Sequence, residues 1–357
     1  MTSIQEPGDA RPGAAGPMRS PDVTRSPGTT GAAAAEAWWP HDARQFTTAG
    51  ERRSHGAPAF TAAEARRVLD AACAAAGFDS RGARTLRLGE NAVHLLASAP
   101  VVVRIARDAT RLPEVRRELA VAAWLQEAGF PAVRPRAGVP QAEVHEGRIV
   151  TFWQWLPDHG GTADFPALAA ALAALHRLPF PSSEGPVLPV LDPLRGAGQH
   201  LAAGAGHVAD ADLEFLARRV GELREEYRAL EFVLPPGPVH GDAHKGNFLR
   251  TASGWAAVLD LECFAHGPRE WDLATALGVP FKGFGWLDED GYRCSAEVYG
   301  FDVTAWTGFD VLRRIRETTM TTALMRDVGH SAEARAEFTR RLRTVRDGRP
   351  PRDWRRF

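Results

Sequence analysis

The chain has 357 residues, of which 44% are hydrophobic and 24% charged, a composition typical of globular proteins and a length that suits two domains or one large two-lobed domain. Its formal net charge of −1 argues against partners held by bulk electrostatics, such as nucleic acid or an anionic membrane. The three cysteines have no C-x-x-C spacing, which argues against a disulfide framework or a cysteine zinc site. Without an apolar run of about 18 residues or a signal-peptide pattern, we expect a cytoplasmic protein.

The N-terminal third changes in character along its length. Residues 1–37 are rich in Pro, Gly, Ala, Ser and Thr without an apolar period, which predicts a disordered tail. A helix is predicted from Thr61, where "TAAE" fits a capping box with Glu64 reaching back to the cap, and it is expected to end at Gly77. The next stretch, "TLRLGENAVHLLASAPVVVRIAR", has short β-rich runs broken by "GEN" and "SAP", and it predicts consecutive antiparallel strands.

Further along, a helix is predicted between Pro113 and Gly129, and "EVHEGRIVTFWQW" predicts a hairpin that turns at Glu146-Gly147. Helical patterns then dominate, interrupted by a small β island at 247–260. The predicted later helices cover residues 165–178, 212–230, 304–328 and 331–345. These patterns predict an α+β fold with a β-rich N-terminal lobe (38–155), a mainly helical C-terminal lobe (156–357) and a hinge between them.

The densest group of polar residues is the stretch "VHGDAHKGNFLR", which contains Asp242 and, five residues later, Asn247. The next strand is predicted to end at Asp260, with Glu262 two residues further on. In an extended segment this spacing puts both carboxylates on one side, and a short hairpin would bring them to the first loop. Carboxylate and amide oxygens without cysteine suit Mg²⁺.

Three interpretations of this group remain open. The loops are simply polar turns, since turns favour such residues; or His240, Asp242 and His244 form a hydrolytic metal centre; or the group carries out phosphoryl transfer, which needs a base for a hydroxyl and oxygen ligands for Mg²⁺. Only the third interpretation gives a role to Asn247 and to the two later carboxylates.

Three stretches resemble a known family. "HGDAHKGN" resembles the H-G-D-x-H-x-x-N catalytic loop of the aminoglycoside phosphotransferase and choline kinase superfamily, whose members are relatives of protein kinases. "VLDLECFAHGPREWDLA" resembles that family's metal-binding segment and the helix after it, and "LAALHRL" resembles its helix ending in Leu-His. The resemblance spans residues 80–347. It implies a two-lobed protein-kinase-like fold that binds ATP and Mg²⁺ between its lobes.

Transferred by position, the resemblance implies that Asp242 is the catalytic base. It makes Asn247 and Asp260 ligands of Mg²⁺, with Glu262 assisting them. His244 has two possible places under this interpretation, one purely structural and one close to the transferred phosphate.

The same resemblance implies supporting roles for other residues. Asp272, in "EWDLA", is expected to bond the backbone of the catalytic loop, and His240 is expected to brace that loop as a hydrogen-bonded core histidine. The hinge, including Gln154 and Leu156, is expected to give adenine its backbone hydrogen bonds.

The nucleotide phosphates are expected in the N-terminal lobe. "LGENAVHLL" resembles the family's nucleotide loop, with Gly89 and Asn91 contributing to an anion-binding turn. Arg104 stands where the family often carries a lysine, and arginine binds phosphate with a different, bidentate geometry. Glu118 lies on an apolar helix stripe, where an acid is costly unless paired. Arg104 is its expected partner, and a surface pair with Arg117 is the alternative.

The leading hypothesis is an ATP-dependent small-molecule kinase that phosphorylates a hydroxyl or amine, and the alternative is a kinase-like nucleotide-binding or regulatory protein without turnover, which only Arg104 favours. Acceptor contacts are expected from residues 185–235 and 280–330. Trp286 and the acids at 288–290 favour a cationic acceptor, such as an aminoglycoside or a choline-like amine. A run of acids is also typical of a helix start, where it meets the positive end of the helix dipole.

Overall fold

The computed structural model describes residues 61–89, 91–106, 109–157, 161–181 and 185–355. The predicted tail at 1–37 lies outside these ranges, as does Glu90 in the "GEN" turn. The helices are α1 (Ala62–Ala76), α2 (Leu112–Glu127), α3 (Phe165–Leu175), α4 (Ala197–Gly204), α5 (Asp210–Arg228), α6 (Arg269–Leu273), α7 (Glu289–Tyr299), α8 (Phe309–Ala323) and α9 (Ala332–Asp347). The strands are β1 (Arg84–Leu88), β2 (Asn91–Leu95), β3 (Val101–Ala106), β4 (Glu143–His145), β5 (Arg148–Gln154), β6 (Gly237–Val239), β7 (Phe248–Arg250), β8 (Ala256–Val258) and β9 (Ala265–Gly267).

The N-terminal lobe is an antiparallel sheet in the order β1-β2-β3-β5-β4, which confirms the predicted strands and the hairpin turn. The capped start of α1 is also confirmed, because the Thr61 hydroxyl accepts a hydrogen bond from the backbone N–H of Glu64 at 3.1 Å. The Glu64 carboxylate does not complete a capping box, however. It accepts two hydrogen bonds from Arg148 on β5, so it ties the helix to the sheet.

Strand alternation gives the two faces of this sheet different chemistry. Val103 and Ile105 of β3 are fully buried in one apolar cluster with Leu69 of α1. Side chains alternate along a strand, so Arg104 lies on the face opposite α1, in register with Thr151 of β5. The arginine is thereby placed on the sheet face that also lines the pocket described below.

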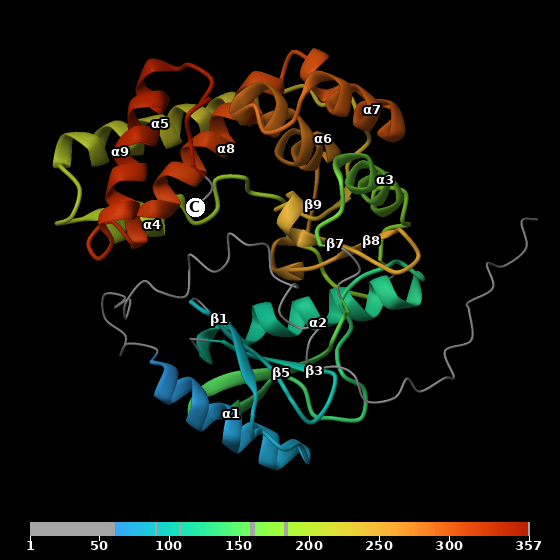
Figure 1. Ribbon diagram of the computed structural model, residues 1–357. Helices are drawn as coiled ribbons and strands as arrows, with labels where there is room; N and C mark the ends of the chain where they lie inside the picture. Colours follow the sequence, from blue (N-terminus) through green and yellow to red (C-terminus); the bar gives the residue numbers. More distant parts are fainter. Residues whose placement is uncertain (1–60, 90, 107–108, 158–160, 182–184, 356–357) are drawn as a thin grey trace, which may run out of the picture. The chain divides into compact units, whose positions relative to one another are not determined.

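The C-terminal lobe is mainly helical, and α3 to α9 all belong to it (Figure 1). Its apolar cluster includes Leu172 of α3 and Leu312 of α8, and it extends to Val121 and Leu125 of α2. Helix α2 thus packs its apolar stripe on the C-terminal lobe. Among the described residues, no helix is long and apolar enough to cross a membrane.

Several element boundaries differ from the sequence predictions. The helix predicted over 304–328 is divided: a 3-10 turn (Val303–Ala305) precedes α8, and a second one (Leu324–Arg326) follows it. The β island forms the predicted hairpin β7–β8, but the second pair, β6–β9, was not predicted because its strands are three residues long and 25 residues apart. Helix α4 and a π-helical stretch at Ala274–Phe284 were also not predicted, whereas α6 lies where the family resemblance implied a helix and α7 begins at the acid run 288–290.

Candidate active site

The loop that carries Asp242 follows β6 and turns sharply at Gly241. The backbone of Gly241 has φ 81°, a conformation that glycine adopts readily and other residues rarely do. A Cβ atom at this position would lie 2.1 Å from the carbonyl oxygen of Cys263. The glycine is therefore required by both its backbone conformation and its packing, and it lets the loop lie directly against the Leu261–Cys263 turn.

Asp272 of α6 fixes the shape of this loop. Its carboxylate accepts hydrogen bonds from the backbone N–H groups of His240 at 2.7 Å and Gly241 at 3.0 Å, and from the His176 ring at 3.1 Å. All three carboxylate contacts are buried or nearly so, and the side chain of Asp272 is fully buried. The predicted structural role of Asp272 is confirmed. His176 donates to Asp272 through Nε2, and its Nδ1 is hydrogen-bonded to the Tyr299 hydroxyl. This role of His176 was not predicted from the sequence.

His240 is the predicted core histidine. It is fully buried, and its Nε2 donates to the backbone carbonyl of Leu259 at 3.0 Å while its Nδ1 accepts from the Asp242 N–H at 3.3 Å. Leu259 N–H in turn donates to the Asn247 carbonyl at 2.8 Å. These bonds join the loop carrying Asp242 and Asn247 to the segment that ends in Asp260.

Loss of the Asp272 carboxylate should destabilise the protein strongly. In Asp272→Asn the amide offers an N–H group toward donors, so buried backbone groups lose charge-assisted hydrogen bonds. We expect the free energy of unfolding, measured in urea, to fall by about 3–5 kcal/mol. Asp290→Asn, at an exposed acid of α7, should stay within about 0.5 kcal/mol. A loss below about 1 kcal/mol for Asp272→Asn would contradict this structural role.

Asp242 lies half-buried beside a cation that the sequence did not indicate. Its Oδ1 accepts a hydrogen bond from Arg316 of α8 at 2.8 Å, and its Oδ2 lies 3.6 Å from His244 Nε2. Burial alone would raise the pKa of Asp242, but Arg316, His244 and His240 outweigh it, so the pKa lies below its ordinary value. Burial together with Arg316 lowers the pKa of His244, against the attraction of Asp242. Asp242 is thus ionised at neutral pH, with Oδ1 bonded to Arg316 and Oδ2 near His244.

The expected ligands Asn247 and Asp260 lie on the two segments that the Leu259 backbone joins. Asn247 donates through Nδ2 to the Asp242 carbonyl at 3.0 Å, which fixes the amide and leaves its Oδ1 as an acceptor. Asp260 is exposed, and within the described ranges its carboxylate takes part in no hydrogen bond or ion pair. Both side chains therefore keep the hard oxygen atoms that Mg²⁺ prefers.

The grouping of Asp260 with Glu262 needs correction. Strand β8 ends at Val258, Asp260 has φ 51°, and Leu261–Cys263 forms a 3-10 turn. The predicted extended segment is wrong, because the left-handed backbone at Asp260 reverses the chain direction. The carboxylate of Glu262 is bound instead by two arginines. Its assistance to a metal ion stays a prediction.

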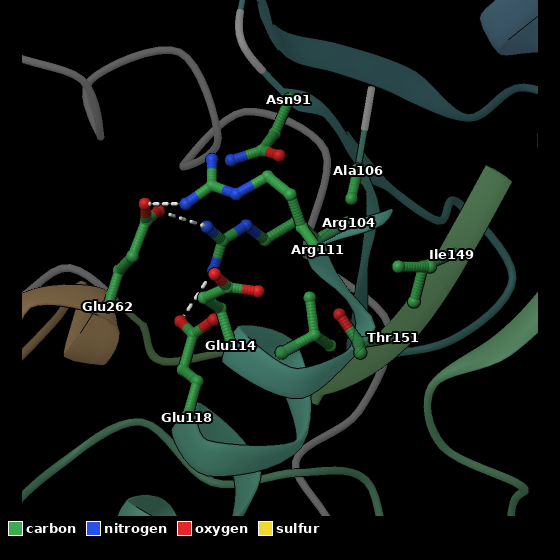
Figure 2. A pocket seen from close by; sticks show the side chains of 10 residues that line it. Asn91, Arg104, Ala106, Arg111, Glu114, Glu118, Ile149, Thr151 and Glu262 are labelled. Atoms are coloured by element: carbon green, nitrogen blue, oxygen red, sulfur yellow. Dashed lines mark hydrogen bonds and ion pairs between the residues drawn. The ribbon is translucent and has the colours of Figure 1, made fainter. Parts of the chain in front are cut away.

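Four of the expected nucleotide and metal residues line one pocket with Arg111 (Figure 2). They are Asn91, Arg104, Glu118 and Glu262. Arg104 donates to Glu118 at 2.5 Å and to Glu262 at 3.2 Å, and Arg111, at the start of α2, also donates to Glu262. The predicted partnership of Arg104 with Glu118 is confirmed, and the surface pair with Arg117 is not what forms.

Electrostatics in this pocket keep Arg104 and Glu262 charged. Burial would lower the pKa of Arg104, but the charges of Glu118, Asp260 and Glu262 raise it above its ordinary value. Burial would raise the pKa of Glu262, yet Arg111 and Arg104 lower it. Asp260 is one of the charges that raise the pKa of Arg104, and its segment is hydrogen-bonded to the loop that carries Asp242. The pocket and that loop are therefore electrostatically connected. Two guanidinium groups converging on one carboxylate form a site suited to phosphate oxygens.

Other expected residues lie outside this pocket. Gly89, Gln154 and Leu156 are not among its lining residues. The Gln154 N–H donates to the Arg134 carbonyl at 2.8 Å, so this amide is not free for adenine. Contacts of adenine with the Gln154 carbonyl and with Leu156, and a role for Gly89 at the phosphates, stay predictions.

The acids at 288–290 prove to begin a helix. The Asp288 side chain accepts from Gly291 N–H and caps α7, and Asp290 pairs with Arg293. Trp286 is partly buried, and its ring lies 4.4 Å from that of Phe284. The interpretation of the acid run as a helix start is therefore confirmed, and an acceptor contact of Trp286 stays a prediction.

The hydrolytic metal centre lacks its ligand arrangement. His240 is turned toward the Leu259 carbonyl, and the positive φ of Gly241 breaks the strand alternation on which that interpretation depended. Across the described ranges, no three His, Cys, Asp or Glu side chains are grouped to hold a metal ion by themselves. An ion bound at Asn247 and Asp260 would need phosphate oxygens and water to complete its coordination.

Comparisons with known proteins agree with this geometry. A model of the phosphotransferase enzyme family matches residues 82–306. Among solved structures, the amicoumacin kinase hAmiN has a TM-score of 0.62 at 15% identity, covering 82% of this chain and 97% of its own. A microcompartment-associated aminopropanol kinase has a TM-score of 0.59 at 18% identity, covering 81% of this chain and 95% of its own. A spectinomycin phosphotransferase has a TM-score of 0.53 at 14% identity, covering 78% of this chain and 93% of its own. No curated protein sequence matches the chain. The predicted kinase-like α+β fold is confirmed.

Proposed function

Because the chain belongs to the phosphotransferase enzyme family, we propose that it transfers the γ-phosphoryl group of ATP to a hydroxyl or amine of a small molecule. One observation carries the proposal. The backbone of Leu259 is bonded to both His240 and Asn247, so a base, Asp242, and two oxygen ligands, Asn247 and Asp260, are held on one connected unit. Phosphoryl transfer needs that combination.

The chemistry assigns a role to each side chain. An acceptor hydroxyl approaches Asp242 Oδ2 and gives it its proton as the oxygen bonds to the γ-phosphorus. The bond from that phosphorus to the β–γ bridging oxygen breaks, and ADP leaves. Since this transition state is loose, most of the catalysis comes from positioning and charge neutralisation. Mg²⁺, held by Asn247 and Asp260 with phosphate oxygens, would supply charge neutralisation on the phosphates.

The nucleotide phosphates are assigned to Arg104 and Arg111. In the structure both guanidinium groups bind the Glu262 carboxylate, which is an oxyanion of the kind that a phosphate would present. The solved structures support a nucleotide here: the amicoumacin kinase structure holds AMP-PNP and Ca²⁺, and one spectinomycin phosphotransferase structure holds ADP. At 14–18% identity, these relatives do not identify the acceptor.

A kinase-like regulatory protein without turnover is not favoured. That alternative depended on arginine standing at position 104. Arg104 forms the ion pair with Glu118, and its planar guanidinium binds Glu262 at the same time. The ammonium group of a lysine is a point charge without this fixed two-sided geometry.

A panel of alcohols and amines, incubated with the protein and Mg²⁺·ATP, tests the proposed activity. Mass spectrometry of each acceptor would show the ATP-dependent gain of one phosphoryl group. Asp242→Asn serves as the inactive control. If the protein binds ATP but no acceptor in the panel gains a phosphoryl group and no ATP is hydrolysed, the regulatory alternative would be supported instead.

Arg104 and Glu118 should be energetically coupled. Removing either one leaves a buried charge without its partner, so Arg104→Ala and Glu118→Ala should each weaken ATP binding or destabilise the protein. The double-mutant cycle, measured by urea unfolding and ATP titration, should show non-additivity of at least about 0.5 kcal/mol. The exposed pair Arg66–Asp70 of α1 is the control, since surface pairs contribute little. Additive effects at Arg104 and Glu118 would contradict the coupling.

A further inference from the structure

Helix α8 carries three arginines close together, and only one of them faces the catalytic carboxylate. Arg313 pairs with Asp310 and Glu317, and Arg314 pairs with Asp310 and Glu226. Arg316 is different: its Nη1 donates to Asp242 Oδ1, and its side chain is 19% exposed. Within the described residues no second carboxylate binds this guanidinium. Its other N–H groups are therefore left for a ligand. Arg316 lies on α8, within the region 280–330, which is one of the two regions in which the acceptor contacts are expected.

The other acids that the sequence patterns linked to the site have other roles in the structure. Asp260 and Glu262 are assigned above to the metal ion and the phosphate-binding arginines. Asp288 caps α7 and Asp290 pairs with Arg293. A positively charged acceptor that placed its hydroxyl on Asp242 would stand beside Arg316, which already pairs with that carboxylate, and like charges at contact distance repel.

We propose that the acceptor carries an anionic group, a carboxylate or phosphate, near its reacting hydroxyl, and that Arg316 binds that group. This inference depends on the proposed phosphotransferase function. Arg316 holds Asp242 through one nitrogen and offers the rest of its planar fork to the acceptor, a geometry that guanidinium groups commonly use for oxyanions. The acceptor class is then hydroxy acids and related anions, rather than amino alcohols or aminoglycosides.

Three probes that share one diol frame test the charge preference. They are glycerate (anionic), glycerol (neutral) and 3-amino-1,2-propanediol (cationic), titrated against the full chain saturated with Mg²⁺·ADP so that the phosphate sites are filled. Ligand-observed NMR gives each dissociation constant. We expect glycerate to bind at least about tenfold more tightly than the amine, as a charge-assisted guanidinium contact would produce. Arg316→Gln should remove the difference, Arg316→Lys should retain part of it, and Arg314→Gln, on the same helix, should leave it unchanged.

The outcomes separate this inference from the function on which it depends. Prior titration with ADP measures nucleotide binding alone, and its failure would contradict the proposed function. With ADP bound, equal binding of the three probes, tighter binding of the amine, or no binding of glycerate up to its solubility would overturn the acceptor proposal alone. If Arg316→Gln does not fold, the wild-type ratio and the Arg316→Lys ratio still decide the result.

Discussion

Asp242→Asn is expected to lower turnover by about 10²–10⁴, the usual effect of removing a positioned base. The asparagine keeps the size of the side chain and an oxygen for Arg316, but it no longer accepts the proton of the acceptor. Asp272 holds the backbone of the loop independently of residue 242, so the fold and ATP binding should persist. Steady-state kinetics with an acceptor from the panel gives the change in kcat, and ATP titration should remain within about twofold.

The matched control for this substitution is Asp290→Asn, which removes an exposed acid that pairs only with Arg293 in the described ranges. It should turn over normally. If Asp242→Asn turned over normally as well, Asp242 would not be the base. Equal loss of ATP affinity and turnover would indicate instead that the substitution has distorted the loop.

Asp260→Ala is expected to abolish the Mg²⁺-dependent part of ATP binding. Asp260 is the carboxylate of the site that has no protein partner among the described residues, so its loss removes the main anionic ligand of an ion that also contacts the phosphates. Calorimetric titration of the Asp260→Ala variant with ATP should give nearly the same affinity with and without Mg²⁺. Unchanged dependence on Mg²⁺ would remove Asp260 from the site.

Two further variants sharpen this test. Asp260 has φ 51°, where alanine is strained but asparagine is tolerated, so Asp260→Asn separates loss of the charge from backbone strain. Glu262→Gln removes the partner of Arg104 and Arg111. A smaller loss of Mg²⁺ dependence in Glu262→Gln than in Asp260→Asn is expected if the arginines are the main partners of Glu262.

Local patterns in the sequence predicted what short-range physics controls. The cap at Thr61 and the hairpin turn at Glu146-Gly147 depend on neighbouring residues, and both are confirmed. The positions of Arg104 and Glu118 followed from strand alternation and an apolar helix stripe. Asp272 was placed correctly through the family resemblance, because its role belongs to a motif with fixed spacing.

Short-range patterns failed where a single backbone angle decided the geometry. An extended segment through Asp260 was predicted from the β-rich run before it, but a left-handed residue ended the strand. The DED run at 288–290 favoured a helix start over acceptor binding, and α7 does begin there.

The sequence by itself determined the fold class and the family, and it singled out the loop that carries Asp242, because these reside in local periodicity and in motifs of fixed spacing. Apart from the pair of Arg104 with Glu118, only the tertiary structure decided which charges meet. Arg316 is 74 residues from Asp242, and Arg111 is 151 residues from Glu262, separations at which no local rule pairs side chains. One local sign existed: an arginine at the N-terminal end of α2 opposes the helix dipole, so Arg111 needed a partner elsewhere. Packing brings α2 and α8 to the loops that carry Glu262 and Asp242, and it thereby gives Arg111 its partner and places Arg316 beside Asp242.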